Sequence, residues 1–141
     1  MNIQQIRTHI KQMGVEAYVV AHGNRFIGED IKTAEHKLKQ ICGFSGSAGI
    51  LAITADKCYL LVDGRYELQA RLETNAEEVE VVDMMPRLKN VCDLLSSYHI
   101  YSVGYDSWNH SVAEMEFIKR RYKDMQFTDI GDLVTDRKSV V

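Results

Sequence analysis

The stretch that decides the fold is GFSGSAG-ILAIT-ADK-CYLLV, residues 43–62. Its first part holds three glycines at a spacing of three, Gly43, Gly46 and Gly49, which favours tight turns because glycine adopts positive φ without steric cost. Two apolar, β-prone runs follow, 50–54 and 58–62, with only Ala-Asp-Lys between them. This pattern predicts a glycine turn that leads into an antiparallel hairpin.

Helix and strand signals alternate on both sides of the hairpin. Before it, helical spacing of isoleucines predicts a helix over 3–13 that ends at Gly14, then a strand over 16–21, a polar loop over 22–33 and a short helix over 33–41 capped by Thr33. After it we expect helices at 66–73, 87–97 and 111–122 and strands at 79–82, 100–105 and 126–130. The alternation predicts a single α/β domain, with a mixed β-sheet flanked by helices.

The composition restricts the class of protein. The chain has 141 residues, 45% hydrophobic and 26% charged, which suits one soluble domain, and its net charge of −3 argues against a nucleic-acid partner. The sequence shows neither an apolar run of membrane-spanning length nor an apolar signal core at its start. Cys42, Cys58 and Cys92 form no CxxC pair, so we interpret them as small buried hydrophobes of a reduced, cytoplasmic protein.

Two patterns allow a ligand but favour a structural role. His110 and Glu114 are four residues apart on an expected helix, yet a metal site needs three or four ligands, so a solvated helix face is the favoured interpretation. The glycines at 43, 46 and 49 could cradle an anion with backbone N–H groups. They precede a strand and lack the GK[ST] or GxGxxG context, so tight turns are favoured.

The strand–helix junction Asp63-Gly64-Arg65-Tyr66 is the more informative segment. Asp63 is suited to capping the helix and Gly64 to turning the chain. Arg65 offers a planar fork for a carboxylate or a carbonyl, or it simply pairs with a neighbouring acid, and the residues alone leave both interpretations open. Trp108, the sole tryptophan, follows the strand at 100–105 and either lines a ligand surface or packs in the core.

Two segments resemble a known family. ICGFSGSAG (41–49) resembles the "GF-x-GSAG" signature of the N-terminal domain of aminopeptidase P and creatinase-like proteins, and DGRYELQA (63–70) is similar to its "DGRY-x-LQA" segment. Residues 17–20 and 102–106 resemble the family's first strand and its "vGvD" strand, and 133–137 its exit in the three-domain form. Departures are Lys138 in place of a common proline, Lys37-Leu38-Lys39 in place of an arginine pair, and the loop at 22–33.

The resemblance implies the creatinase N-terminal fold, with a ribonuclease H-like motif, across residues 1–141. It also implies a metallopeptidase parent, an Xaa-Pro aminopeptidase that removes the residue preceding proline. Two divalent metal ions, usually manganese, would sit in a later pita-bread catalytic domain, which we expect to be absent from this chain. We therefore expect no catalytic and no metal-binding residue here, and an inactive domain when alone. Arg65 is the residue that the resemblance assigns to substrate binding.

The resemblance further implies what the domain contacts. It would wall the active-site cleft, bind short proline-containing peptides, pack on its own C-terminal catalytic domain and support homodimer contacts, without nucleic acid or membrane. Two alternatives stay open. The same domain occurs on Xaa-Pro dipeptidases and creatinase-like hydrolases, and the chain could also be a free-standing binding module. A set of Asp, Asp, His, Glu and Glu ligands after residue 141 would indicate an enzyme, and a stop codon the module.

Overall fold

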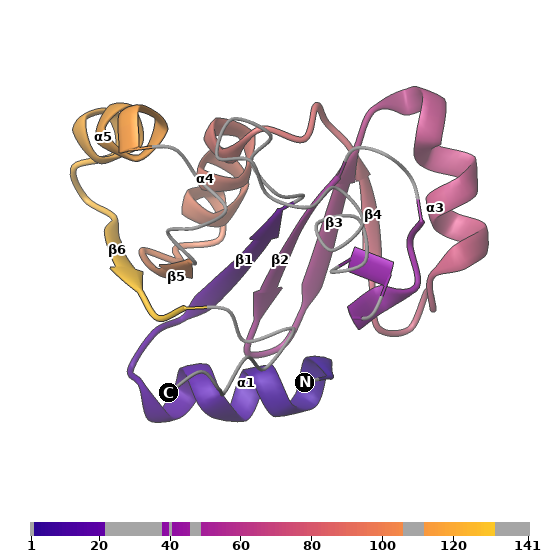
Figure 1. Cartoon of the computed structure of the whole chain (residues 1–141), viewed down its shortest axis with the longest axis horizontal. Coiled ribbons are helices and arrows are strands. Elements are labelled where there is room, and N and C mark those ends of the chain that lie inside the picture. The colour runs from indigo at the N-terminus through magenta and orange to yellow at the C-terminus, as the bar shows by residue number, and fades with distance from the viewer. Residues whose placement is uncertain (1, 22–37, 40, 46–48, 106–111, 132–141) are drawn as a thin grey trace.

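The computed structural model describes residues 2–21, 38, 39, 41–45, 49–105 and 112–131 (Figure 1). Six strands of this part form one sheet in the order β4-β3-β2-β1-β5-β6. The strands are β1 (Ala17–Ala21), β2 (Ile50–Thr54), β3 (Cys58–Val62), β4 (Glu80–Asp83), β5 (Ser102–Tyr105) and β6 (Gln126–Asp129). The helices are α1 (Ile3–Gln12), the 3-10 turn η2 (Gly64–Tyr66), α3 (Glu67–Glu73), α4 (Leu88–Ser97) and α5 (Val112–Arg121).

The sheet is mixed because β2 alone of these strands runs against its neighbours. β1 and β3 both pair antiparallel with β2, whereas the β1–β5, β3–β4 and β5–β6 pairs are parallel. The predicted hairpin is confirmed, with Ile53 opposite Cys58 next to the turn. The prediction of one α/β domain with a mixed sheet between helices is confirmed as well.

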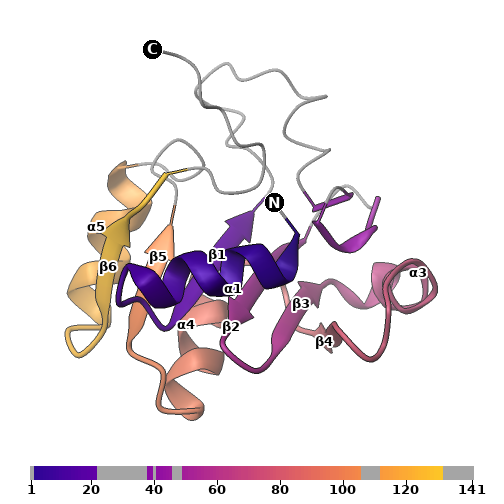
Figure 2. The same cartoon turned by 90° about the horizontal axis from the view of Figure 1, so that it is seen from below.

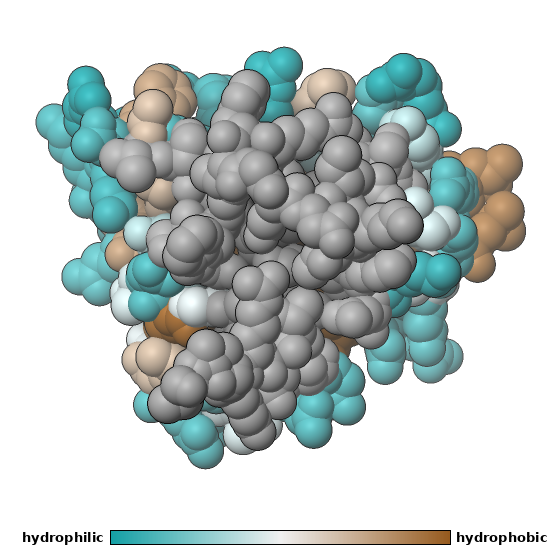
Figure 3. All heavy atoms as spheres, in the orientation of Figure 1, coloured by the Kyte–Doolittle hydropathy of each residue, from teal (hydrophilic) through white to brown (hydrophobic). Residues whose placement is uncertain are grey.

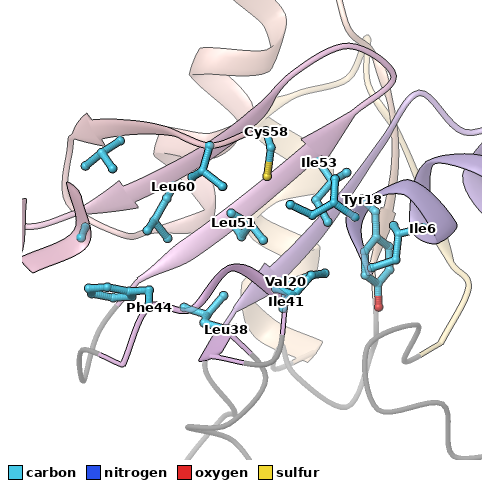
Figure 4. Packing of buried hydrophobic residues seen from close by; sticks show 14 of the residues in the cluster. Ile6, Tyr18, Val20, Leu38, Ile41, Phe44, Leu51, Ile53, Cys58 and Leu60 are labelled. Carbon is cyan, nitrogen blue, oxygen red and sulfur yellow. The ribbon is translucent and has the colours of Figure 1, made fainter. Parts of the chain in front are cut away.

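Both faces of the sheet are covered, so its centre is apolar throughout. α1 packs on one face through Ile3, Ile6 and Ile10, whereas α4 and α5 pack on the other (Figures 1 and 2). Every residue of β2 and β3 is buried, as expected for strands enclosed on both sides. Figure 4 shows the α1 side of this core, where side chains from the strands meet Phe44 and Leu38 of the segment before β2.

The helices predicted at 3–13, 66–73, 87–97 and 111–122 are confirmed, with one local difference. The helix expected at 66–73 begins as the 3-10 turn η2 and becomes α-helical at Glu67. Its leucines share a face as expected, but that face is solvent-exposed: Leu68 is 71% and Leu72 77% exposed, and Figure 3 shows hydrophobic surface on the α3 side. α3 lies beside the outer strand β4, so only the small side chain of Ala70 becomes fully buried.

Several predictions fall on residues outside the described part. These are the loop at 22–33, most of the helix at 33–41, Gly46, Trp108, His110 and the exit at 133–138. Residues 38, 39 and 41 of the predicted helix are helical, as is residue 42 just after it. Within the described ranges, none of the helices has the length and apolar character needed to cross a membrane.

The predicted burial of the cysteines is confirmed for two thiols and in part for the third. Cys58 and Cys92 are buried, Cys42 is half-buried, and all three are free. Burial raises the pKa of Cys42 to about 11 and the pKa values of Cys58 and Cys92 to about 12. Thiols with such pKa values carry little thiolate at neutral pH, so they serve as packing groups and not as nucleophiles.

Candidate functional site at the carboxyl edge of the sheet

Five of the described strands end at the same edge of the sheet, because β1, β3, β4, β5 and β6 run in one direction. We call this the carboxyl edge; it includes Asp63 after β3 and Asp83 at the end of β4, whose partner in the register is Val62. Ligands of open α/β sheets bind at this kind of edge. Arg65 therefore lies at the edge where chemistry is expected.

Arg65 is held by the residue that caps its own turn. The Oδ1 atom of Asp63 accepts a hydrogen bond from the Arg65 backbone N–H at 3.0 Å, which confirms the predicted cap. Its Oδ2 atom accepts from Nε and Nη2 of the guanidinium at 3.2 and 3.0 Å. The backbone N–H of Arg65, and then its guanidinium, hold the pKa of the Asp63 carboxyl below its ordinary value.

The guanidinium is oriented but accessible. The Arg65 side chain is 78% exposed, and its Cζ atom lies 5.7 Å from the centroid of the Tyr66 ring. Nη1 has no hydrogen-bond partner among the described residues. The pairing with Asp63 that was one open interpretation is thus present, and an exposed pair of this kind contributes little to stability because water screens it. A role in peptide binding stays a prediction.

The glycine turn beside this edge has a structural role at Gly43. Gly43 has φ of +91°, which confirms that at least one of the glycines adopts positive φ. A Cβ atom at Gly43 would lie 2.7 Å from the carbonyl oxygen of Glu73. At Gly49 it would lie 3.0 Å from Cε2 of the buried Phe44 ring. Gly43 therefore requires glycine, because a side chain would collide with backbone, whereas at Gly49 a side chain would press on the Phe44 ring.

The turn is tied to α3 by a carboxylate. Glu73 accepts the Ser45 backbone N–H at Oε1 (2.9 Å) and the Ser45 hydroxyl at Oε2 (2.7 Å). Gln69 Nε2 donates to Ser45 Oγ and to Glu73 Oε1, both at 3.2 Å. The Ser45 backbone N–H, and then its hydroxyl, lower the pKa of Glu73. We call Ser45, Gln69 and Glu73 the Ser45 clamp.

The Ser45 clamp argues against an anion cradle in the described part of the turn. An anion would need free N–H groups, but the N–H of Ser45 is already bonded to a carboxylate, whose charge would repel a phosphate. The clamp also joins the two resembling segments, 41–49 and 63–70, because Ser45 of the first accepts a hydrogen bond from Gln69 of the second. Sequence reasoning missed Gln69 and Glu73, whose only local signal is their i, i+4 spacing.

The metal interpretation receives no support from the residues that can be placed. Across 2–21, 38, 39, 41–45, 49–105 and 112–131 there is no group of three His, Cys, Asp or Glu side chains that could hold a metal ion. Glu114 lies in the first turn of α5, and its suggested partner His110 is outside these ranges. Of the sequence-predicted ligand residues, the structure therefore places Arg65 at the carboxyl edge and leaves Trp108 and His110 undescribed.

The family follows from a match over nearly the whole chain. Residues 2–137 match the model of the creatinase/prolidase N-terminal domain family. This chain belongs to the creatinase/prolidase N-terminal domain family. The sequence resemblance is thereby confirmed at the level of the family.

Curated and structural relatives agree with this assignment. The Xaa-Pro aminopeptidase 1 of Dictyostelium discoideum is 31% identical over 141 residues, which cover 96% of this chain and 22% of that protein. The solved X-Pro aminopeptidase of Thermotoga maritima has a TM-score of 0.78 at 21% identity, covering 100% of this chain and 37% of the other. The X-prolyl aminopeptidase of Caenorhabditis elegans has a TM-score of 0.78 at 20% identity, with 99% and 26% covered. The chain thus spans about a fifth of the length of the Dictyostelium relative.

Proposed function

We propose that this chain is the non-catalytic N-terminal domain of a metal-dependent Xaa-Pro aminopeptidase, a cytoplasmic hydrolase that removes an N-terminal residue preceding proline. The observation that carries the proposal is the 31% identity, over 96% of this chain, to a protein named Xaa-Pro aminopeptidase. The relative is several times longer than this chain, which supports a separate catalytic domain as the partner. The solved Caenorhabditis elegans protein is described as cytosolic, which supports the compartment.

The metal ions belong to the catalytic domain in this proposal. The Caenorhabditis elegans enzyme is described as having a di-nuclear active site, which supports two divalent ions, and we propose manganese for both. When bound, such ions supply an activated water for attack on a carbonyl. The described residues of this chain do not fit them, because none of their His, Cys, Asp and Glu side chains form a cluster of three.

The role that we propose for the domain is to wall the cleft and position short proline-containing peptides. Arg65 is the contact. Its guanidinium stays protonated, so it cannot act as a general base, but it can donate two parallel N–H groups to a peptide carbonyl or terminal carboxylate. Asp63 holds Nε and Nη2 in place, and Nη1 points free of any described partner. The arginine is thus oriented before a peptide arrives, which lowers the entropy lost on binding.

Replacing Arg65 separates the binding role from a structural one. In the full-length enzyme, Arg65→Ala should lower kcat/KM for an Xaa-Pro tripeptide by roughly tenfold or more, because a charge-assisted hydrogen bond is lost. The melting temperature of the 141-residue chain should stay nearly unchanged, since the Asp63 pair is exposed. Steady-state kinetics and thermal melting measure the two effects.

Arg71→Ala is the matched control for this experiment. Arg71 is 59% exposed on α3, the helix that follows the turn of Arg65, and makes a loose 3.9 Å pair with Glu67, so its loss should alter neither kinetics nor melting. Unchanged kinetics in Arg65→Ala would overturn the binding role. A large fall in melting temperature would instead make Arg65 a structural residue. Faster cleavage of Xaa-Pro dipeptides than of tripeptides by the parent enzyme would favour the dipeptidase alternative.

A further inference from the structure

An open groove of about 890 Å³ lies at the edge of the sheet opposite to the carboxyl edge. Its lining comes from α1, from the turn between β2 and β3, and from the two connections that lead into β1 and β5. We call it the amino-edge groove. Its volume is within the range of sites that bind small ligands and short peptides. Because Arg65 lies at the other end of the strands, a ligand here would not compete with a peptide held by Arg65.

Two helices, α1 and α4, end beside this groove, each in a turn with the same pattern of hydrogen bonds. At the end of α1, Gly14 N–H donates to Lys11 O (3.3 Å) and Val15 N–H to Ile10 O (2.9 Å). At the end of α4, His99 N–H donates to Ser96 O (3.0 Å) and Ile100 N–H to Leu95 O (3.0 Å). Both are Schellman motifs, in which the residue after the cap adopts the left-handed region.

The two motifs differ in the residue that bears the positive φ. Gly14 has φ of +75° and His99 has φ of +62°. Glycine takes this conformation without a steric penalty, whereas a residue with a Cβ atom does not. His99 is the one non-glycine residue with positive φ in the described part of the chain. The end of α1 is therefore free of backbone strain, whereas the end of α4 is strained at His99.

Packing does not explain why a histidine occupies the strained position. The His99 side chain is exposed at the groove, and its ring only tilts against Tyr101 with the centroids 6.5 Å apart. Next to it, Tyr98 stacks on the buried Tyr59 ring at 5.5 Å and remains 52% exposed. One side of the groove is thus a flat aromatic wall. A strained residue that lines a groove points to a role for its side chain.

Cationic side chains line the other side of the groove. Arg7 donates from Nε to the carbonyl oxygen of Thr54 at 2.8 Å, which fixes its guanidinium and leaves its terminal nitrogens without partners in the described residues. Lys11 and Lys57 are exposed at the same groove. Two acidic residues line the same groove: Glu16, whose Oε1 accepts the backbone N–H groups of residues 101 and 102, both at 3.1 Å, and the exposed Asp56. The cations Arg7, Lys11 and Lys57 outnumber these two carboxylates, so the net charge of the lining is positive.

We propose that the amino-edge groove binds an acidic peptide segment, with a carboxylate on Arg7 and an aromatic side chain against Tyr98 and His99. The fixed guanidinium suits a carboxylate, because it presents parallel N–H groups. The aromatic wall adds contact area that a simple anion would not use, and tyrosine and arginine are enriched in protein interfaces. A peptide uses both sides of the groove, whereas free phosphate uses only one.

The test is an NMR titration of the isotope-labelled 141-residue chain with acetyl-Glu-Phe-Glu-amide. Saturable shifts at the amides of residues 98–101 are expected, and acetyl-Gln-Phe-Gln-amide should bind roughly tenfold more weakly or worse, since the charged hydrogen bond is lost. Arg7→Gln should weaken binding by a similar factor. Arg120→Gln on α5 makes the same change in net charge away from the groove and should leave binding unaltered.

His99→Gly tests the strain independently of the charge. This variant should melt about 2–4 °C higher, because the backbone strain is relieved, while its affinity for the Glu-Phe-Glu peptide falls several-fold. A lower melting temperature would show that His99 is not strained, and this would overturn the proposal. Absence of saturable shifts, equal binding of the Gln peptide, equal weakening in Arg120→Gln, or the same shifts with inorganic phosphate would each overturn the proposal.

Discussion

Gly43→Ala should lower the free energy of unfolding by about 2–4 kcal/mol, the sum of two effects. The positive φ of +91° disfavours any residue with a Cβ atom, by about 1 kcal/mol. The new Cβ would also lie 2.7 Å from the carbonyl oxygen of Glu73, a backbone atom that cannot rotate away, and overpacking of this kind costs about 1–3 kcal/mol. Urea denaturation of the variant and the parent measures the difference.

Gly14→Ala is the matched control, because it shares the backbone conformation but not the collision. Gly14 has φ of +75°, and a Cβ built there meets no heavy atom within 4 Å. Its replacement should therefore lower stability by only about 1 kcal/mol, the conformational part alone. The additional loss of stability in Gly43→Ala, compared with Gly14→Ala, measures the contact between the glycine turn and α3. Equal losses for the two variants would contradict that contact.

Phe44→Ala should be the most damaging substitution in the glycine turn, with a loss of about 3–5 kcal/mol. The Phe44 side chain is fully buried, in the same cluster as Leu38 and Leu60 (Figure 4). Its removal leaves a cavity between the turn and the sheet that the surrounding strands cannot fill without moving. Phe117→Ala is the control: that ring is 52% exposed on α5, so its loss should change stability by about 0.5 kcal/mol or less.

The Phe44 ring also restricts the side chain that residue 49 can carry, and a double-mutant cycle can measure this restriction. A Cβ at residue 49 would lie 3.0 Å from Phe44 Cε2 and 3.2 Å from Leu38 Cδ1. Gly49→Ala should therefore destabilise the parent chain, and less so when Phe44 is already leucine, because the smaller side chain can give way. Additive losses in the two backgrounds would show that the ring does not restrict residue 49.

These helices and strands can be predicted from the sequence because the signals for them are local. The isoleucines of α1 recur at helical spacing, the hairpin is two apolar runs around a three-residue turn, and the capping by Asp63 follows from its position before a helix. Each of these depends on neighbouring residues, so propensity and periodicity indicate it directly. The mixed sheet then follows from one antiparallel hairpin among helix-linked strands.

The parts that sequence could not predict depend on contacts between distant residues. Ser45 and Glu73 are bonded across 28 positions, and the collision that forbids a side chain at Gly43 involves the same residue 73. Similarly, the exposure of Leu68 and Leu72 follows from where α3 lies beside β4, because the spacing of the leucines is the same for a buried and an exposed face. The amino-edge groove could not be predicted for the same reason, because its lining comes from three separate stretches of the chain, 4–16, 54–59 and 98–100.

We propose above all that this chain serves peptide cleavage without performing it. The most direct measurement is hydrolysis of an Xaa-Pro tripeptide by the purified 141-residue chain with manganese, beside the full-length enzyme at equal concentration. We expect cleavage by the full-length enzyme and, for the chain alone, only the rate of the metal blank. Cleavage by the chain alone that rises in proportion to its concentration would contradict it.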